Sequence, residues 1–298
     1  MSRLNHIKRH TIQSLREFNL FYDEPVVNHL TDWSYPNHFF SYFKKESTKL
    51  VVMLQGAINR SKMQPPIFQR WSWSEEINAS VLILNDPTLF GNQLRIGWWQ
   101  GCEEQYAIPS AAEFIKLVIH KLGYSSNDLL FFGSSAGGFS ALMMAGHLKG
   151  SLAIVNNPQT NILAFREEDV QAFLQTKFGD ISKKEGFSRY AIRFSASEWF
   201  KSIHYMPKIV YYQNVKDPFH FDKHYLPFVQ TLYQSALDPN EFQSILYADD
   251  KGHYPLPAAK TVSIINDWVA KLSELEQKIK PEKVFKHANL PIPFASNQ

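Results

Sequence analysis

The sequence predicts an α/β fold with a mostly parallel central sheet flanked by helices. Short apolar runs with no polar alternation recur along the chain, and segments with helical patterns separate them. Strands buried on both faces read as such runs, and parallel strands need helical crossovers between them. The runs are residues 49–54, 79–84, 128–132, 151–155 and 208–212, with a last strand at 244–247.

The composition is that of one globular domain spanning residues 1–298. The chain is 44% hydrophobic and carries a formal net charge of +3, which is too mild to indicate a nucleic-acid partner. A single cysteine, Cys102, excludes an intrachain disulfide. The N-terminal residues lack the apolar core of a signal peptide, and no run reaches transmembrane length. We therefore expect a cytoplasmic protein with no integral membrane segment.

The N-terminal part is rich in turns and polar residues. We expect a loosely held arm over residues 1–14, followed by strands at 14–22 and 37–43. The buried strand at 49–54 ends at Gln55-Gly56-Ala57. Further on, Ser110-x-x-Glu113 has the form of a capping box and predicts a helix from Ser110 to about residue 122.

The C-terminal half contains the best candidate for an insertion. Residues 160–206 are polar, charged and helical in places, which predicts a cap or lid inserted into the domain. A helix is expected over 222–237 and a final helix after 253, with an irregular tail after Pro281. The final helix should bury one apolar face, formed by Val262, Ile265, Trp268, Leu272 and Leu275.

The pattern Gly133-x-Ser135-x-Gly137 lies between the apolar strand at 128–132 and a helix expected over 136–148. A strand that turns sharply into a helix around a serine needs small residues two positions before and after it. The turn lifts the Ser135 hydroxyl clear of the sheet, beside the unpaired first amides of the helix. The context predicts a nucleophilic serine, the alternative being a plain glycine-rich turn.

Two more residues follow the later strands in a meaningful order. Asp217 comes after the strand at 208–212, and His253 comes after the last strand. This order of serine, acid and histidine resembles that of the α/β-hydrolase superfamily, over roughly residues 45–275. The resemblance implies an α/β-hydrolase fold and a catalytic triad of Ser135, His253 and Asp217.

In such a triad, His253 would act as the base for Ser135, and Asp217 would hold the ring and stabilise its charge. Asp222 and Asp249 are rival acids, although either could instead cap a helix or lie in solvent. A surface loop position is the alternative for His253. The oxyanion donors should be the amide of Ala136 and one amide after the strand at 49–54.

For that second amide we expect Ala57 first and Gly56 second. The chain lacks the His-Gly-Gly-Gly loop of hormone-sensitive-lipase-like esterases, although it shares Ser-Ala-Gly-Gly with them. Direct assignment to that subgroup is therefore not supported.

Three other features have two interpretations each. His220-x-Asp222-x-His224 could suggest a metal site, but alternate residues at a helix start point in different directions, so we expect none. Trp98 and Trp99 could bind a sugar substrate at the mouth of a cleft or simply pack in the core. Four cations flank the predicted catalytic loops and are expected on a solvated surface rather than in an anion site: Arg60, Arg95, Lys216 and Lys223.

A finer resemblance rests on three short motifs, Asn-Asp-Pro-Thr-Leu at 85–89, Gly-Trp-Trp at 97–99 and Gly-Ser-Ser-Ala-Gly-Gly-Phe at 133–139. They are similar to those of bacterial enzymes of surface-glycan synthesis, among them capsule O-acetyltransferases. The resemblance implies acetyl-CoA as a co-substrate, no bound cofactor, and a carbohydrate or small acyl ester as substrate. An esterase or deacetylase is the alternative, and a non-catalytic binding protein with this fold is a further one. The sequence does not indicate an oligomeric state.

Overall fold

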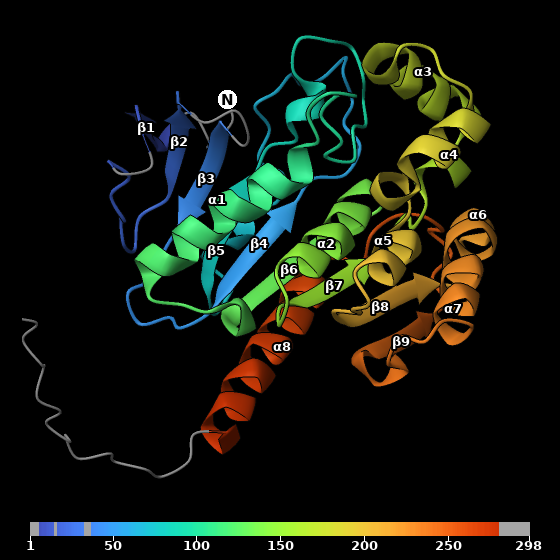
Figure 1. Cartoon of the computed structure of the whole chain (residues 1–298). Helices are drawn as coiled ribbons and strands as arrows, with labels where there is room; N and C mark the ends of the chain where they lie inside the picture. The colour runs from blue at the N-terminus through green and yellow to red at the C-terminus, as the bar shows by residue number, and fades with distance from the viewer. Residues whose placement is uncertain (1–5, 15–16, 33–36, 280–298) are drawn as a thin grey trace, which may run out of the picture.

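In the computed structural model, which describes residues 6–14, 17–32 and 37–279, nine strands form one sheet (Figure 1). Their spatial order is β1-β2-β3-β5-β4-β6-β7-β8-β9. The strands are β1 (Lys8–Ile12), β2 (Val26–Leu30), β3 (His38–Tyr42), β4 (Leu50–Leu54), β5 (Ser80–Leu84), β6 (Leu129–Ser134), β7 (Leu152–Asn156), β8 (Lys208–Asn214) and β9 (Phe242–Tyr247).

The sheet is mixed but mostly parallel. Strand β3 pairs antiparallel with both β2 and β5, and every other neighbouring pair is parallel. The central strands β4, β5, β6 and β7 are buried along their whole length, which explains their uninterrupted apolar sequences. The predicted mostly parallel α/β sheet is confirmed.

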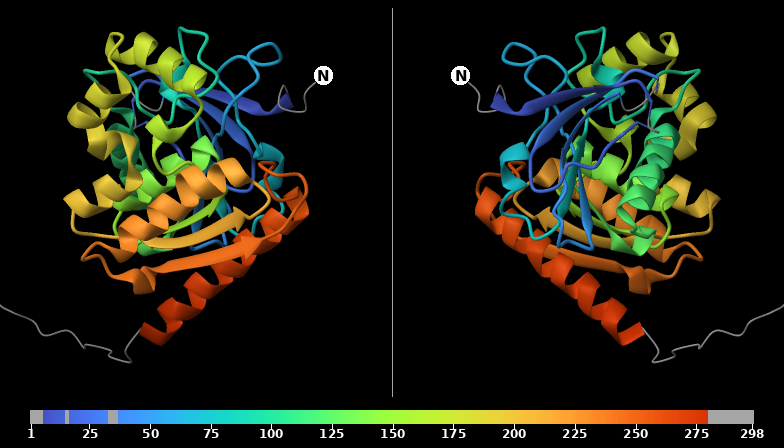
Figure 2. Two further views of the ribbon diagram at one scale, coloured as in Figure 1. Left: turned by 90° about the vertical axis from the view of Figure 1, so that its right-hand side faces the viewer. Right: turned by 90° about the vertical axis from the view of Figure 1, so that its left-hand side faces the viewer.

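Helices cover both faces of the sheet (Figure 2). The helices α1 (Ala107–Leu122) and α2 (Ala136–His147) lie on one face with α5 (Ala196–Ser202) and α7 (Leu226–Tyr233), above the larger apolar core. Helix α8 (Ala258–Ile279) covers the other face, where Val262, Ile265 and Leu272 are buried as expected. Trp268 is only partly buried, and the side chain of Leu275 lies outside the described part.

Three helices fill the predicted insertion between β7 and β8: α3 (Glu167–Phe178), α4 (Lys183–Phe194) and α5. Helix α5 packs closely on α2, where a side chain at Gly146 would meet the indole of Trp199 at 2.5 Å. Helices α3 and α4 project beyond the ends of β7 and β8 (Figure 1). Residues 160–206 thus form a helical segment at the side of the sheet where β7 and β8 end.

Short helical turns complete the chain. They are the 3₁₀ segments η2 (Trp71–Trp73), η3 (Pro87–Leu89), η4 (Ser126–Asp128), η5 (Ile162–Ala164) and η7 (Pro239–Glu241), the short helix α6 (Pro218–His220) and the π-helix η6 (Phe221–Tyr225).

The N-terminal prediction was wrong in two places. Residues 8–12, expected in a loose arm, form the edge strand β1, which pairs in parallel with β2. Most of its side chains are exposed, so its sequence is polar and lacks a buried strand's signature. The strand expected at 14–22 does not form over its described residues, and β2 begins instead at Val26, after Pro25.

Two helix boundaries also differ. Helix α1 begins at Ala107 rather than Ser110, because Pro109 falls in the first turn, where a missing N–H leaves no hydrogen bond unmade. The helix expected at 222–237 begins earlier, at Pro218, passes through the π-helix and ends at Tyr233. The tail after Pro281 lies outside the described residues.

Candidate active site

Ser135 occupies the turn from β6 into α2, with φ = 55° and ψ = −123°. This backbone conformation is strained for a residue with a side chain, and it is the kind of strain found at functional sites. A Cβ at Gly133 would lie 2.1 Å from the Gly137 carbonyl oxygen, and one at Gly137 would lie 2.4 Å from that of Leu54. Glycine is therefore required at both positions, because any side chain would collide with backbone.

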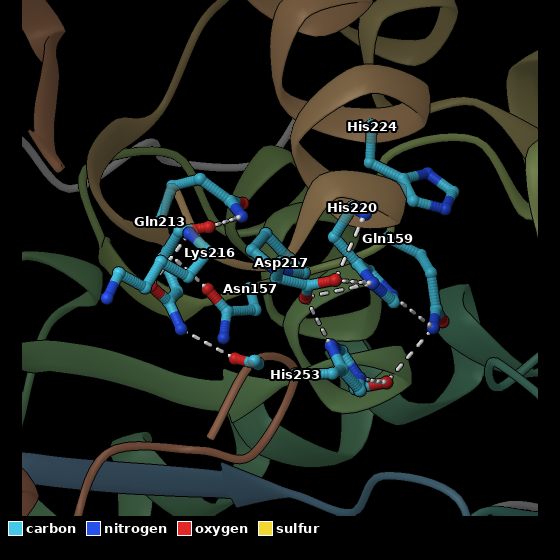
Figure 3. A network of polar contacts seen from close by, with 12 residues as sticks. Asn157, Gln159, Gln213, Lys216, Asp217, His220, His224 and His253 are labelled. Carbon is cyan, nitrogen blue, oxygen red and sulfur yellow. Dashed lines mark hydrogen bonds and ion pairs between the residues drawn. The ribbon is translucent and has the colours of Figure 1, made fainter. Parts of the chain in front are cut away.

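Asp217 and His253 face each other beyond the carboxyl ends of β8 and β9 (Figure 3), and Ser135 at the end of β6 meets them there. The Ser135 Oγ lies 3.0 Å from Nε2 of His253, and Nδ1 of the same ring lies 2.8 Å from Oδ2 of Asp217. The rival acids are elsewhere: Asp222 is exposed on η6, and Asp249 accepts a hydrogen bond from the backbone N–H of Lys251. The arrangement permits proton transfer from serine to imidazole with a carboxylate behind the ring.

Asp217 is buried and remains ionised. Burial alone would raise the pKa of its carboxyl, but hydrogen bonds from His220 and His253 outweigh burial and hold the pKa well below its usual range. The backbone N–H of His220 also donates to Oδ1 at 3.3 Å. A fixed negative charge thus faces the imidazole of His253.

A second histidine shares this carboxylate. His220 is buried, places Nδ1 3.2 Å from Oδ1 of Asp217, and stacks on His253 with ring centroids 3.7 Å apart and planes 11° from parallel. Burial, followed by the charge of His253, lowers the pKa of His220 despite its hydrogen bond to Asp217. A neutral His220 therefore backs the His253 ring and limits its rotation.

The buried side chain of Gln159 connects the nucleophile to the core. Its Oε1 lies 2.7 Å from Nε1 of Trp98, and its Nε2 lies 3.0 Å from Ser135 Oγ and 3.4 Å from Nε2 of His220. An indole N–H can only donate, so the Gln159 oxygen faces Trp98 and its amide nitrogen faces the site.

This orientation fixes the tautomer of His220. Since the Gln159 amide donates to His220 Nε2, the His220 proton sits on Nδ1 and is donated to Asp217. The same amide donates to Ser135 Oγ, which also lies within hydrogen-bond distance of His253 Nε2. Ser135 Oγ is therefore held between the Gln159 amide and the His253 imidazole.

Asn214, at the end of β8, joins the loops that carry the acid and the base. Its Nδ2 donates to the carbonyl oxygens of Asp249 and Gly252, each at 2.7 Å, and its Oδ1 accepts the N–H groups of Lys216 and Asp249. The side chain is fully buried. It therefore fixes the backbone next to His253 relative to the loop of Asp217.

Two backbone amides beside Ser135 are unpaired within the described part of the chain, those of Ala136 and Ala57. The third candidate, the amide of Gly56, already donates to Oε1 of Gln69 at 3.1 Å. The geometry thus favours Ala57 over Gly56 as the partner of Ala136 in an oxyanion hole.

Ser135 opens into a hollow of about 450 Å³. Its walls are formed by the loop at Gly56 and Ala57, by Gln69 and Arg70, by Ser134, by Arg166 at the start of the insertion, and by residues 253–255. The space is large enough for an acyl group together with part of its carrier.

Of the two interpretations of Trp98 and Trp99, packing in the core is the one that the structure supports, and the prediction that they bind a sugar at the mouth of the cleft is wrong. Both indoles are fully buried, and Trp98 packs edge-on against Phe165 and Phe173. Their backbones adopt φ = 51° and 59°. Trp98 contacts the site through its hydrogen bond to Gln159.

The four cations named from the sequence do not line the hollow at Ser135. Arg95 pairs with Asp169 at 2.5 Å, Lys216 pairs with Asp250 at 2.5 Å, and Lys223 is exposed on η6. Arg60 donates to the carbonyl oxygens of Leu94 and Leu89.

Potential metal ligands do not gather at the sequence pattern that suggested them. His220 and His224 are buried, whereas Asp222 is exposed. Among the described residues, one group of three has ligand atoms within 4.8 Å of one another: Asp217, His220 and His253. Its carboxylate already accepts hydrogen bonds from both rings.

Gln159, Asn214 and Arg70 were not singled out from the sequence, and His220 was considered only as part of a metal-site pattern. A signal existed for two of them, since Asn214 and Gln159 stand in polar runs that directly follow buried strands. Carboxyl ends of parallel strands meet at one edge, so such runs are candidates for a site. Arg70 comes from a loop with no pattern, and its place at the site is a tertiary property.

The described residues contain no helix long and apolar enough to cross a membrane.

A scan with protein-family models finds no match, and neither does a sequence search of curated proteins. Solved structures do match. The capsule O-acetyltransferase of Neisseria meningitidis serogroup A superposes with a TM-score of 0.56 at 14% identity, over 80% of this chain and 91% of that one.

An S-formylglutathione hydrolase from Agrobacterium tumefaciens superposes with a TM-score of 0.53 at 15% identity, over 80% of this chain and 89% of that one. A putative esterase from Staphylococcus aureus gives a TM-score of 0.52 at 12% identity, over 79% of each chain. At these identities the likeness concerns the fold. Together with the order of β6, β8 and β9 and of the residues that follow them, it establishes that this chain has the α/β-hydrolase fold.

Proposed function

We propose that this protein is a serine acyltransferase that forms a covalent ester on Ser135. The supporting observation is the hydrogen-bonded series from Ser135 Oγ through His253 to Asp217, at 3.0 and 2.8 Å, beside two unpaired amides. Serine is a weak nucleophile unless a base lies within hydrogen-bond reach, and here one does.

In the first half-reaction, His253 Nε2 takes the Ser135 proton as Oγ attacks the acyl carbonyl carbon. The developing oxyanion is stabilised by the amides of Ala136 and Ala57. When the tetrahedral intermediate collapses, the bond to the leaving group breaks and His253 returns the proton to it. Asp217 stabilises the imidazolium in between.

In the second half-reaction, His253 deprotonates an acceptor hydroxyl, whose oxygen attacks the carbonyl carbon of the ester on Ser135. The bond between that carbon and Ser135 Oγ then breaks, His253 returns the proton to Oγ, and the acceptor leaves with the acyl group. We propose acetyl-CoA as donor and a sugar hydroxyl of a bacterial surface carbohydrate as acceptor. This choice is supported by the three short motifs and by the fold shared with a capsule O-acetyltransferase, which has also been solved in complex with CoA (TM-score 0.54, 14% identity). We place the reaction in the cytoplasm and give the 160–206 insertion the role of a cap.

A carboxylesterase is the second candidate, and one observation favours it. The tryptophans expected to hold a sugar are buried, while Tyr254 at the rim of the hollow is 74% exposed. A site open at its rim admits water as the acceptor. A non-catalytic binding protein is less consistent with the hydrogen-bonded series, because binding alone needs no serine–histidine–aspartate arrangement.

The proposal is tested by intact-mass measurement after exposure to acetyl-CoA and to 4-nitrophenyl acetate. The wild type should gain one acetyl group, and Ser135→Ala should gain none while losing at least about a thousandfold in turnover. A fluorophosphonate probe should label the wild type at Ser135 alone. Ser134→Ala is the matched control and should still be acylated. Acylation or labelling that persists in Ser135→Ala would overturn the proposal.

A further inference from the structure

The hollow at Ser135 has a one-sided charge. Two arginines, Arg70 and Arg166, contribute to its walls, together with His253, and no aspartate or glutamate does. The carboxylate of Asp217 is buried behind His253 and accepts hydrogen bonds from both neighbouring rings. A molecule entering the hollow therefore meets positive charge on two sides, although the net charge of the whole chain is only +3.

Arg70 lacks the partner that a partly buried arginine usually has. Its guanidinium donates to Ser134 Oγ at 2.7 Å and lies 5.5 Å from the ring centres of Trp73 and Phe132, and no described carboxylate is within ion-pair distance. Burial lowers its pKa to about 10, so the group is still charged at neutral pH. A guanidinium has five N–H donors, and removing its charge from water is unfavourable unless an anion compensates.

The backbone conformation of Arg70 is strained. Its φ of 66° places it in the left-handed region, which disfavours residues with a Cβ. It immediately precedes η2 and hydrogen-bonds to Ser134, the neighbour of the nucleophile. The loop thus carries a strained residue whose charged end lies beside Ser135.

Arg166 lines the hollow from the start of α3, whereas Arg70 lines it from the residue before η2. It is the exposed N-cap residue of α3, at the start of the insertion, with its guanidinium 5.8 Å from the ring centre of Phe165. After burial and the charge of His253, the charge of Arg166 also lowers the pKa of His220. An exposed arginine at the rim attracts an anion, while a less exposed one further in fixes it.

We infer that the hollow binds a substrate with a carboxylate or phosphate group, which Arg70 holds by charge-assisted hydrogen bonds and Arg166 attracts from the rim. The inference rests on the proposed acyl transfer at Ser135 and adds the substrate class to it. Such a group can belong to the acyl chain, to the carrier of the acyl donor, or to the acceptor. Each source places the same chemistry within reach of Arg70.

Three pairs of probes distinguish these sources, each matching an anionic compound with a neutral one. The mono-4-nitrophenyl ester of adipic acid is compared with its methyl ester, acetyl-CoA with S-acetylpantetheine, and methyl glucuronide with methyl glucoside as acceptor. The readout is the ratio of kcat/KM for the anionic to the neutral member of each pair.

In the wild type, at least one pair should favour the anion by about tenfold or more, since hydrogen bonds to charged groups are roughly twice as strong as neutral ones. Arg70→Gln should bring that ratio close to one, Arg70→Lys should restore part of it, and Arg166→Gln should lower it two- to threefold. Lys62→Gln removes an exposed positive charge outside the hollow and should keep the wild-type ratio.

Failure of this inference can be told apart from failure of the proposed function. If Ser135→Ala still turns over the neutral esters, the acyl-serine mechanism is wrong. If Ser135 is required but no pair favours the anion, or Arg70→Gln matches Lys62→Gln in every pair, the anion site is wrong. Calorimetry of the anionic member of the favoured pair on Ser135→Ala, with and without Arg166→Gln, needs no turnover and no folded Arg70 variant. Binding that is equal in both would also overturn the inference.

Discussion

Ser135, the proposed nucleophile, accepts a hydrogen bond from Gln159. The Gln159 amide is the one buried side-chain donor to Ser135 Oγ among the described residues, and the indole of Trp98 fixes its orientation. A donor at this position keeps Oγ in the rotamer that meets His253 and stabilises charge on the oxygen as its proton leaves.

Gln159→Leu should therefore lower kcat about 10- to 100-fold, the size expected for losing one buried hydrogen bond to a reacting atom. It should also lower the free energy of unfolding by about 1–3 kcal/mol, because the Trp98 N–H is left buried without an acceptor. Steady-state kinetics with 4-nitrophenyl acetate and urea unfolding measure the two effects.

Trp98→Phe separates the effect on kcat from the effect on the free energy of unfolding. It removes the indole N–H that orients the Gln159 side chain but keeps the Gln159 amide itself. Gln171→Leu, at an exposed position of α3, is the control for the substitution itself. If Gln159→Leu retained the wild-type kcat, the amide would have no part in the reaction and would only fill the core.

Among the structural elements, the end of β8 controls how the acid and base loops meet. The buried side chain of Asn214 makes four hydrogen bonds. They join the backbone of the loop that carries Asp217 to the backbone of Asp249 and Gly252. Loops carry functional residues with precision only when the scaffold fixes them.

Asn214→Ala should free the loop 249–253 and lower kcat about tenfold or more, because small misplacements of a catalytic group are costly. Hydrogen exchange of amides in this loop should accelerate, while exchange in β4 and β6 stays slow. Asn240→Ala, on an exposed residue of η7, serves as the matched control. Unchanged exchange in the loop would show that other contacts hold His253 in place.

The elements that the sequence predicted well are those whose local pattern and tertiary role agree. The strands β4, β5, β6 and β7 are buried on both faces and therefore read as apolar runs. Ser135 directly follows such a strand, β6, whereas Asp217 follows the largely buried β8 and His253 follows the more exposed β9, so for these two the order along the chain carried the prediction.

The sequence predictions that were wrong concern residues whose local pattern and tertiary role do not agree. Strand β1 is an exposed edge strand, so its sequence has no alternation of buried and exposed residues. Trp98 and Trp99 have left-handed backbone, which no sequence motif predicted. Arg70 approaches Ser134 across 64 residues of chain, a contact made only by folding. Local sequence carries no signal for contacts of that kind.

For the molecule as a whole, buried neutral histidines make stability depend on pH. Burial, then the charge of Lys116, lowers the pKa of His147 to about 4, with Glu113 opposing, and burial and His29 lower that of His38 to about 4. The folded chain thus resists protonation of these rings, whereas the unfolded chain takes up protons below about pH 6.5. Stability is complete above that pH and is lost as the pH falls.

The free energy of unfolding should therefore drop between pH 7 and pH 5, with His147 alone accounting for about 2 kcal/mol. In His147→Gln this drop should be smaller by about that amount, while His120→Gln, at an exposed position of α1, should follow the wild type. Urea unfolding at the two pH values measures the difference. An equal drop in both variants would place the acid sensitivity elsewhere.

The wide spacing of the proposed catalytic residues has a consequence for synthesis of the chain. Ser135 precedes His253 by 118 residues, and the strand that leads to His253 lies at the edge of the sheet, next to β8. At about 5–20 residues per second, the ribosome adds that stretch over roughly 6–24 seconds. Throughout that interval the nascent polypeptide carries Ser135 without the imidazole that meets it in the folded chain, so the hydrogen-bonded series at Ser135 forms only after β9 and the loop of His253 have been translated.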